Sequence, residues 1–549
     1  MKSMQGEKIK VGLLIDDFVL PAWLYEMLKR VAESNYATVS FIVKNNKAVG
    51  GEGKGLKNLA YSLYRKLESK IVKANPNAFS RKNITGIAGN IESLEVQSFS
   101  KNGFDYFEDK DIELIASYQP DVLLKLGAGK ISGGILNAAK YGVWAYQIGD
   151  YDLAKGAPAG VWEVIEGRCS TGILLKILRE NGEADILCRS YSSTNVAINK
   201  NLNLACWKAV SFVPRQLKKL FENRDTFFAD VKKNDIKPAL QNSKGLYKTP
   251  GNPTFIAYLF KRYYKLFKRK AWKLFNDEQW ILLYSFSHNK NLPFADFNYK
   301  ELMPPKDKFW ADPCDFTTTD GKHFIFFEEF VYKTKKAHLS VVELDTAGKI
   351  SEPEIILNKP YHLSYPFVFT VGEDIFMVPE SSANKTIELY KCKSFPGVWE
   401  FQMNLMENLH AVDATVHFQD NKFWLFVNIK ENKGASAWDE LFLFYADNLQ
   451  TNNWQAHPQN PIISDVRTAR PAGRLFTREG KLYRPSQDCS CTYGYATNLN
   501  EVLVMNEKEY SEKLVTTLFP QWNKKVTAVH TLSYSDGLSV IDARYKRRM

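Results

Sequence analysis

The second half of the chain is a repeated alternation of apolar and polar residues. From residue 309 onward, five hairpins recur, each with a polar residue, a small residue or proline, an alternating strand, a turn and a second strand. They are ADPCDFTTTDGKHFIFFEE from Ala311, SYPFVFTVGEDIFMVPE from Ser364, VDATVHFQDNKFWLFVN from Val412, ARPAGRLFTREGKLYRPSQ from Ala469 and VHTLSYSDGLSVIDA from Val529. They start about 50 to 60 residues apart, which is typical of four-stranded propeller blades.

The last hairpin needs outer strands from elsewhere, because the chain stops at Met549 just after its second strand. The run QWILLYSF, residues 279–286, precedes the first hairpin and has the pattern of a strand. Pairing this run with the end of the chain would remove a free sheet edge. We therefore predict an all-β five-bladed propeller over residues 278–549.

The first half alternates strand and helix patterns instead. The runs KVGLLID, TVSFIV, DVLLKLG and GVWAYQIGD, which begin at residues 10, 38, 121 and 142, read as strands separated by helical segments. This order predicts an open, doubly wound α/β domain over residues 8–215, with ligands at the carboxyl ends of its strands. Residues 216–277 are predicted to be a linker that includes a helix over about 253–275.

The predicted helix at residues 253–275 is strongly basic and rich in aromatic residues. Its sequence FIAYLFKRYYKLFKRKAWKLF, residues 255–275, interleaves seven cations with aromatic residues and contains no acid, in a chain of net charge +12. A basic aromatic helix of this kind suits peripheral contact with an anionic membrane. No nucleic-acid-binding motif accompanies the charge, and no long apolar run predicts a spanning segment. The expected location is cytoplasmic, with association at the inner face of a membrane.

The hairpin geometry concentrates polar groups at one end of the propeller. In an antiparallel hairpin the first residue of one strand lies beside the last residue of the other, and the first strand of each blade lines the axial channel. One mouth of the channel is therefore expected to collect a ring of polar side chains: Asp312, Glu328 or Glu329, Tyr365, Glu380, Asp413, Asn428, Arg470, Gln487, Asp488, His530 and Asp542. Arg484 is a further predicted substrate-binding residue.

Such a ring suits a saccharide. Carboxylates and amides pair with sugar hydroxyls, and Trp310, Tyr365 and Tyr493 are expected to stack on a sugar ring. Glycosyl chemistry requires two carboxyl groups, and crowding several acids separates their pKa values into an acid and a base. The alternative is that these groups only satisfy one another around a wet channel.

Several blocks of the second half resemble a known family. FWADPCDF, HLSYPFVF, IFMVPES, FPGVWEF, TARPAGRLF, LYRPSQDCSCTYGYA and HTLSYSDGLSVIDA are similar to the propeller domain named after the amino-terminal part of glucosamine inositolphosphorylceramide transferase, over about residues 278–545. That domain is itself similar to five-bladed arabinanase- and xylosidase-type glycosidases. The resemblance implies Asp312 as base or nucleophile, Glu380 as acid and Asp413 as the group that orients the base. The blade order leaves open an exchange of roles between Glu380 and Asp413.

The first half resembles formyltransferases through YGVWAYQIGDYDLAKGAPAGVWEVIEGRCSTGILL, residues 141–175. The family's reaction needs an Asn-x-His pair, and the matching positions here are Ala145 and Gln147, so the resemblance implies a degenerate active site. Asp150, Lys155 and Glu163 are the remaining polar residues of this loop, and they are predicted to bind a sugar or nucleotide unless the domain is only a scaffold.

These observations predict a carbohydrate-active protein of surface polysaccharide or glycolipid biosynthesis. Its expected partner is a saccharide or glycolipid. Hydrolysis and transfer use the same carboxylates, so the sequence does not distinguish a glycoside hydrolase from a glycosyltransferase. Two alternatives stay open: a noncatalytic glycan-binding scaffold, and a formyltransferase for a sugar nucleotide, which Ala145 and Gln147 argue against. The sequence predicts no cofactor and no metal site, because no zinc-ligand spacing or calcium loop is present.

Overall fold

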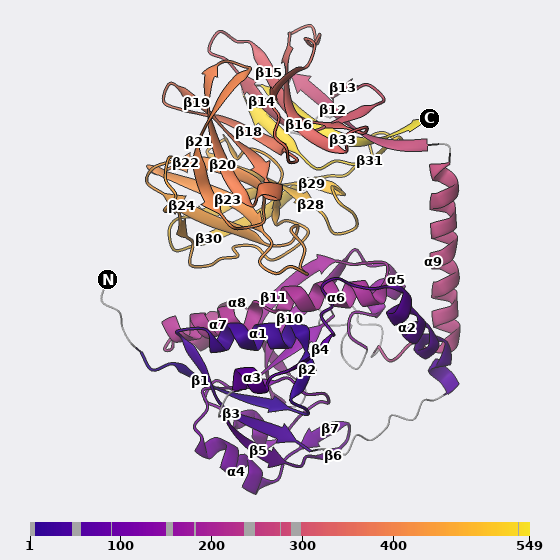
Figure 1. The fold of residues 1–549 in the computed structure, drawn as a ribbon, viewed down its shortest axis with the longest axis vertical. Coiled ribbons are helices and arrows are strands. Elements are labelled where there is room, and N and C mark those ends of the chain that lie inside the picture. The colour runs from indigo at the N-terminus through magenta and orange to yellow at the C-terminus, as the bar shows by residue number, and fades with distance from the viewer. Residues whose placement is uncertain are drawn as a thin grey trace. The chain divides into compact units, whose positions relative to one another are not determined.

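The computed structural model describes residues 6–46, 56–88, 91–149, 158–180, 183–234, 247–274, 276–286, 298–535 and 537–548. These residues form two compact units: the first reaches to Lys261 and includes residues 432–435, and the second contains the rest of the chain from Arg262. The amino-terminal unit is mixed α/β and the propeller of the second unit is all β, as the sequence pattern predicts (Figure 1).

The amino-terminal unit is built on a seven-stranded sheet of order β11-β10-β9-β8-β1-β3-β5. Its strands are β1 (Ile9–Ile15), β3 (Ala37–Asn45), β5 (Glu92–Val96), β8 (Val122–Lys125), β9 (Val143–Ile148), β10 (Ser170–Leu178) and β11 (Ala184–Ser193). The first five are parallel, whereas β10 and β11 add in antiparallel fashion. The four strands expected from the sequence are β1, β3, β8 and β9, so that prediction is confirmed.

Helices cover both faces of this sheet because its central strands are apolar on both sides. Leu13 of β1 packs in a core with α1 (Ala22–Ala32) and α7 (Phe212–Glu222), whereas Leu14 packs in a second core with α4 (Asp109–Ser117). The other helices are α2 (Leu59–Ile71), α3 (Thr85–Ala88), α5 (Trp162–Glu166), α6 (Ile198–Ala209) and α8 (Phe227–Asn234). Two small sheets, β2 (Val19–Pro21) with β4 (Arg81–Asn83) and β6 (Phe99–Lys101) with β7 (Phe104–Tyr106), lie beside it. This is the layered arrangement of a doubly wound domain.

The second unit is a five-bladed propeller. Blade 1 is β14 (Lys308–Thr317), β15 (His323–Val331), β16 (Lys336–Leu344) and β17 (Glu354–Leu357). Blade 2 is β18 (Ser364–Val371), β19 (Asp374–Ser381), β20 (Thr386–Ser394) and β21 (Val398–Glu407), and blade 3 is β22 (Ala411–Gln419), β23 (Lys422–Ile429), β24 (Leu441–Ala446) and β25 (Gln455–Ala456). Blade 4 is β26 (Arg470–Pro471), β27 (Phe476–Arg478), β28 (Lys481–Asp488), β29 (Ala496–Met505) and β30 (Tyr510–Leu518).

The fifth blade closes the ring with strands from both ends of the unit. It joins β12 (Asn276–Phe286) and β13 (Lys300–Leu302) to β31 (Val526–Ala528), β32 (Leu532–Ser535) and β33 (Leu538–Arg548). β12 pairs antiparallel with β33 from Asn276↔Arg548 to Phe286↔Leu538. The predicted closure by residues 279–286 is therefore confirmed, and this pairing leaves neither strand as a free edge.

Helix α9 (Asn252–Lys273) precedes the propeller and carries the basic aromatic sequence. Phe255 and Tyr258 near its start are buried against Val161, Val164 and Ile198 of the amino-terminal unit. Phe260 and Phe267 are exposed. Among the described residues, none of the helices is both long enough and apolar enough to pass through a bilayer.

The packing of blade 4 against β32 yields a stability prediction. Gly473 has φ +136°, and a Cβ there would lie 1.9 Å from the carbonyl oxygen of Leu532. We expect Gly473→Ala to lower the free energy of unfolding by about 3 kcal/mol or more, because backbone must move. Gly372→Ala is the control: its φ is +61° but nothing lies within 4 Å. Its expected loss is about 1–2 kcal/mol from the left-handed backbone alone. Equal losses in urea unfolding would contradict the steric argument.

Candidate functional site at the propeller mouth

The inner strands of blades 1, 2 and 3 share an irregular backbone at the same position. Asp312, Tyr365 and Asp413 have φ values of 51°, 46° and 53°, in the left-handed region that residues other than glycine rarely adopt. In each blade the strand register shifts just there, between Ala311 and Cys314 in blade 1 and at the equivalent positions of the others. A bulge that recurs in three blades, at a cost of about 1–2 kcal/mol each, indicates that the side-chain directions matter.

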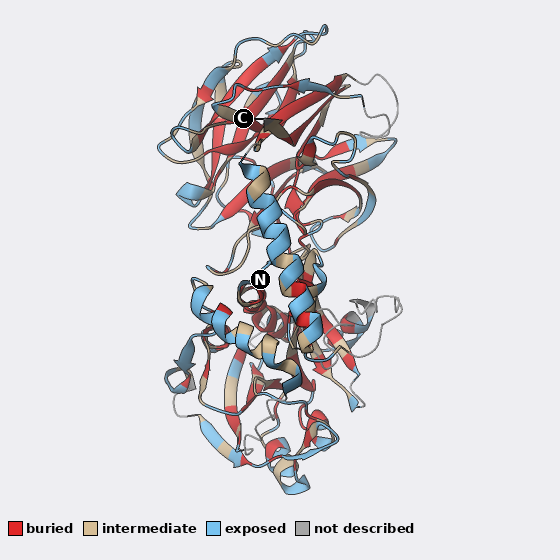
Figure 2. Ribbon diagram, turned by 90° about the vertical axis from the view of Figure 1, so that its right-hand side faces the viewer, coloured by how far each residue is buried: buried red, intermediate tan, exposed pale blue. Residues whose placement is uncertain are grey.

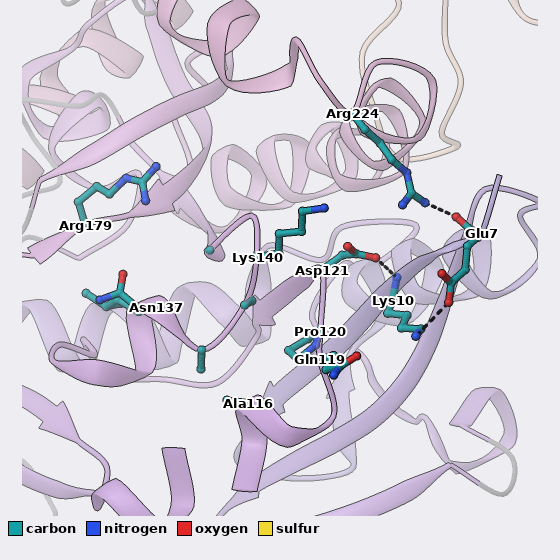
Figure 3. A pocket seen from close by; sticks show the side chains of 14 residues that line it. Glu7, Lys10, Ala116, Gln119, Pro120, Asp121, Asn137, Lys140, Arg179 and Arg224 are labelled. Carbon is teal, nitrogen blue, oxygen red and sulfur yellow. Dashed lines mark hydrogen bonds and ion pairs between the residues drawn. The ribbon is translucent and has the colours of Figure 1, made fainter. Parts of the chain in front are cut away.

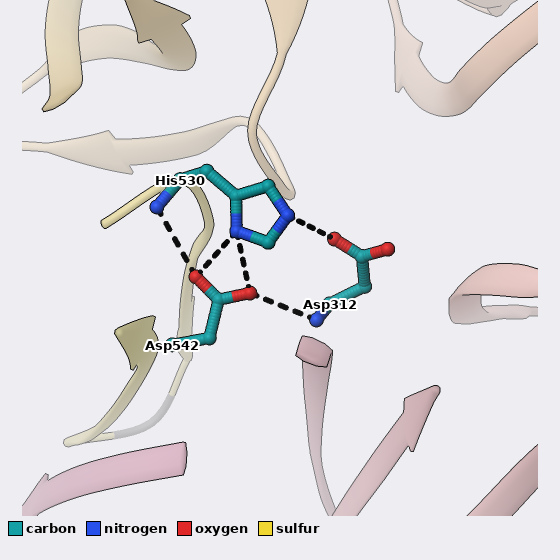
Figure 4. Close-up of side chains that lie close together, drawn as sticks. All are labelled: Asp312, His530 and Asp542. Carbon is teal, nitrogen blue, oxygen red and sulfur yellow. Dashed lines mark hydrogen bonds and ion pairs between the residues drawn. The ribbon is translucent and has the colours of Figure 1, made fainter. Parts of the chain in front are cut away.

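A chain of three buried groups joins the last blade to the first (Figure 4). His530 lies between two carboxylates, with Nδ1 2.7 Å from Asp542 Oδ1 and Nε2 3.2 Å from Asp312 Oδ1. Asp542 also accepts hydrogen bonds from the backbone N–H groups of Asp312 at 2.9 Å, His530 at 3.1 Å and Thr531 at 3.0 Å. The Asp542 carboxylate therefore fixes both the imidazole and the backbone of Asp312.

A second cluster surrounds Asp413. Arg470 donates from Nε and Nη2 to its two carboxylate oxygens at 2.5 and 3.1 Å, and Gln487 Nε2 donates at 2.8 Å. Arg470 Nη2 also lies 3.8 Å from Glu380 Oε2, and its guanidinium lies 5.0 Å from the ring centroid of Tyr493. These contacts bring residues from blades 2, 3 and 4 together, with Asp413 held as the fixed centre.

Burial separates the proton affinities of the acids. It raises the pKa of Asp312 to about 7, although the ion pair with His530 opposes the rise. Burial and the adjacent Asp413 raise the pKa of Glu380 to about 8. Burial, with Asp312 and Glu380 nearby, holds the pKa of Glu328 well above its usual range. Burial opposes ionisation of Asp542 as well, but the charge of His530 and the hydrogen bonds outweigh it, so the pKa of Asp542 is lowered.

Aromatic rings surround His530. Trp280 of β12 stacks on the imidazole with centroids 4.2 Å apart, and Tyr493 meets it edge-on at 5.1 Å. Sequence reasoning assigned Trp280 only to the strand that closes the ring. Its place beside the acids follows from the pairing of β12 with β33, which carries Asp542.

Three residues expected at the mouth lie elsewhere. Trp310 packs with Phe327 in a core between the first and last blades and donates from Nε1 to Glu329 at 2.8 Å. Glu329 also accepts from Lys308 at 2.9 Å, and it is on the opposite face of β15 from Glu328, because successive side chains alternate. Arg484 is buried against Glu512 of β30. Of the two alternatives, Glu328 is therefore the one beside Asp312 at the mouth. The structure does not place Trp310 or Arg484 there.

Other expected residues are placed as follows. Tyr365 is buried, and its hydroxyl lies 2.8 Å from Thr415 Oγ1 of the next blade. Asp488, at the end of β28, accepts a hydrogen bond from the backbone N–H of Ser490 at 2.9 Å. Asp312 therefore shares the mouth with Glu328, Tyr365, Glu380, Asp413, Arg470, Gln487, Tyr493, His530 and Asp542.

A small cavity adjoins Asp312. Its volume is about 10 Å³, and Tyr365, Gly473, Arg474 and Ser533 are among the residues that line it. This is room for about one water molecule. Arg474 was not expected here; its Nη2 donates to the Val368 carbonyl at 2.6 Å, in the blade that follows Asp312.

Among the described residues, one group has donor atoms close enough together to hold a metal ion. It consists of Asp312, His530 and Asp542, whose donor atoms all lie within 4.8 Å of one another. Both ring nitrogens of His530 already face a carboxylate, and a metal-bound nitrogen would have to give up one of these contacts. This arrangement fits a shared proton between the three groups better than a metal site.

The amino-terminal unit brings few of its expected residues together. Ala145 and Gln147 lie on β9, and the side-chain oxygen of Gln147 accepts a hydrogen bond from Lys176 Nζ at 2.8 Å. Glu163 is buried in α5. Asp150 and Lys155 lie outside the described residues. Neither Ala145 nor Gln147 supplies a group that takes up a proton near neutral pH.

A cavity of about 590 Å³ in this unit lies at the amino ends of the parallel strands (Figure 3). Lys10 at the start of β1, Asp121 before β8 and Gly142 before β9 line it, with Lys140 and Arg224. Ligands of doubly wound sheets bind at the carboxyl ends of the strands, whereas these are the amino ends. Of the residues predicted to bind a ligand in this unit, Ala145, Gln147 and Glu163 are not among those that line the cavity.

Comparison with known proteins adds a family relationship for the propeller. Residues 300–537 match the family model described as glucosamine inositolphosphorylceramide transferase 1, N-terminal. The protein of that name from Oryza sativa subsp. japonica is 35% identical over 207 residues, which are 37% of this chain and 27% of the relative. Its counterpart from Arabidopsis thaliana is 31% identical over the same shares. The chain thus spans about a quarter of the length of these relatives.

Solved structures with low sequence identity align with each half. A family 117 glycoside hydrolase, Zg3597 of Zobellia galactanivorans, is 9% identical with a TM-score of 0.32, covering 49% of this chain and 91% of that one. The α-L-arabinanase of Penicillium chrysogenum is 14% identical with a TM-score of 0.30, covering 39% and 69%. Glycinamide ribonucleotide transformylase 1 of Symbiobacterium toebii is 14% identical with a TM-score of 0.27, covering 40% and 91%.

The raised pKa of Asp312 predicts how propeller stability depends on pH. A carboxyl group with a raised folded-state pKa contributes stability below its unfolded-state pKa, and this is lost as the pH rises through about 7. We expect Asp312→Asn, which cannot ionise, to lose less stability than the parent between about pH 4 and pH 8, and to melt roughly 3–5 °C higher at the upper pH. Asp320→Asn, in the exposed turn after β14, is the control and should follow the parent. Parallel curves for all three proteins would show that Asp312 does not titrate in this range.

Proposed function

We propose that the propeller mouth carries out glycosyl chemistry on a saccharide, either transfer or hydrolysis. Three crowded carboxyl groups support this role. Asp312 and Glu380 are held with raised pKa values, whereas Asp413 is bound by Arg470 and Gln487. A pair of carboxyl groups with different proton affinities is what cleavage of a glycosidic bond requires.

In the proposed mechanism Asp312 is the base or nucleophile. His530 lies beside its Oδ1, and Asp542 holds both the imidazole and the Asp312 backbone, so the carboxylate is kept in one orientation. Glu380 is the acid and protonates the leaving oxygen. Asp413 orients these groups by fixing Arg470, whose guanidinium lies between the two acids of blades 2 and 3.

The proposed substrate is a glycolipid or a saccharide linked to a lipid. The matching relatives are named as transferases of glucosamine inositolphosphorylceramide, and the sugar of such a substrate is presented at a bilayer. Helix α9 supplies seven cations and exposed aromatic rings in one segment, and we propose that it brings the protein to an anionic membrane surface.

A second candidate function is glycan binding without turnover. It is favoured by the small cavity beside Asp312, which has room for about one water, and by the hydrogen bonds that already occupy Asp413 and Asp542. In this case the acids hold the blades together and the sugar binds at the rim.

A turnover screen separates the two functions. The full chain, Asp312→Asn and the exposed-turn control Asp320→Asn are compared on aryl furanosides, aryl pyranosides and sugar-nucleotide donors. We expect the parent and the control to release product and Asp312→Asn to lose at least about a thousandfold in kcat/KM, as expected for removal of a base or nucleophile. No turnover by the parent, with equal saccharide binding by all three proteins, would favour the binding function.

The same pKa values predict the pH profile. Activity should rise as Asp312 ionises near pH 7 and fall as Glu380 loses its proton near pH 8. The plot of activity against pH should therefore be a narrow bell-shaped curve. Glu380→Gln should remove the upper limb and retain activity on aryl glycosides with acidic leaving groups, which need little protonation. A profile that stays flat between about pH 6 and pH 9 would exclude this assignment of acid and base.

A further inference from the structure

Helix α2 exposes an unbroken row of large aliphatic side chains. Leu56 just before the helix and Leu59, Leu63, Leu67 and Ile71 within it follow one another every three or four residues, so they lie along one face. Leu63 is 57% exposed, Leu67 54% and Ile71 69%. Isolated exposed leucines are ordinary, whereas a continuous row of five indicates a binding surface.

The other face of α2 is firmly attached to its own unit. Tyr61 and Tyr64 pack edge-on against Phe255 of α9, with centroids 5.4 and 5.3 Å apart. The buried carboxylate of Glu68 accepts hydrogen bonds from the backbone N–H groups of Ile198 and Asn199 at the start of α6, both at 3.1 Å. These contacts fix the rotation of the helix, so the aliphatic row points outward.

The charge around this row has one sign. The exposed residues Lys57, Lys66, Lys70 and Lys73 flank it, and the segment from residue 56 to residue 73 contains a single acid, Glu68, which is buried. Lysine side chains beside an apolar row can extend their charged ends toward lipid headgroups. The surface is therefore complementary to an apolar layer covered by negative charge.

Helix α9 begins beside the start of α2 and also exposes apolar side chains. Asn252 Nδ2 donates to the Leu56 carbonyl at 2.8 Å, and its Oδ1 accepts from the backbone N–H of Ala60 at 2.9 Å. Ile256 and Phe260 follow one turn apart, 56% and 76% exposed. Figure 2 shows many exposed residues along both helices, and Figure 1 shows α2 beside the start of α9.

We infer that α2 and the start of α9 together form a membrane-binding surface, in which the aliphatic row of α2 enters the headgroup region of an anionic bilayer. The inference extends the membrane contact proposed for α9 to a second helix, and it does not depend on the glycosyl chemistry. α2 supplies aliphatic side chains that insert, whereas α9 supplies cations and aromatic rings. Two helices that bind at once anchor the protein better than either alone.

Vesicle sedimentation of the full chain tests this inference. The vesicles are phosphatidylcholine alone, or phosphatidylcholine with about a third phosphatidylglycerol. We expect the parent to bind the anionic vesicles at least about tenfold more strongly, and less strongly as salt is raised. Leu63→Gln with Leu67→Gln should weaken this binding about tenfold, because two inserted side chains are lost while every charge is retained.

A matched control uses exposed leucines of the propeller. Leu503 of β29 and Leu514 of β30 are 55% and 50% exposed, so Leu503→Gln with Leu514→Gln makes the same chemical change in the other unit. It should bind as the parent does. Ile256→Gln with Phe260→Gln tests the α9 contribution separately, and an unchanged melting temperature for each variant shows that it is folded.

Two results would overturn the inference. In the first, the α2 variant binds anionic vesicles as tightly as the parent, so α9 acts alone. In the second, the parent does not bind vesicles but sediments as a dimer, and the α2 variant sediments as a monomer; the row would then be an interface between copies of this chain. None of these measurements uses turnover, so failure of the glycosyl proposal is recognised separately.

Discussion

One buried carboxylate links the closure of the propeller to the geometry of its mouth. Asp542 stands on β33, the strand that pairs with β12 to close the ring, and it accepts the backbone N–H of Asp312 from the first blade at 2.9 Å. It also accepts two further backbone N–H groups and holds His530. An unsatisfied buried carboxylate is very unfavourable, so these donors stabilise the closed ring. The left-handed backbone of Asp312 is therefore held by a side chain of the strand that joins the two ends of the unit.

The second constraint is the crowding of acids in a space with little water. Asp312, Glu328, Glu380, Asp413 and Asp542 cannot all be ionised together at such proximity. The propeller separates them by giving each a different environment: Asp542 has an imidazole and backbone N–H groups, Asp413 has a guanidinium and an amide, and the rest are left with raised pKa values. A mouth that only needed to be sealed could use apolar residues, which would be more favourable.

The polar mouth and the apolar helices deviate from ordinary folding preferences in opposite ways. At the mouth, ionisable groups are buried and three inner strands adopt strained backbone. On α2, large aliphatic side chains are exposed although the inner face of the helix is well packed. Both arrangements are unfavourable for an isolated protein, and both are explained if each awaits contact with another molecule.

The architecture can be read from the chain alone, because periodicity and turn residues are local properties. The five hairpins, the closing strand at residues 279–286 and strands β1, β3, β8 and β9 could all be predicted from the alternation of apolar and polar residues. The sequence also determined which strand ends meet at the mouth. Which side chains point into the mouth depends instead on how distant segments pair in the folded protein. Glu328 faces the mouth and Glu329 does not, because adjacent residues of a strand point to opposite faces and the register is set by the partner strands. Trp280 lies at the site and Trp310 lies in a core cluster for the same reason. Their positions depend on pairing between segments that are far apart in the chain, and a local sequence pattern does not contain this information.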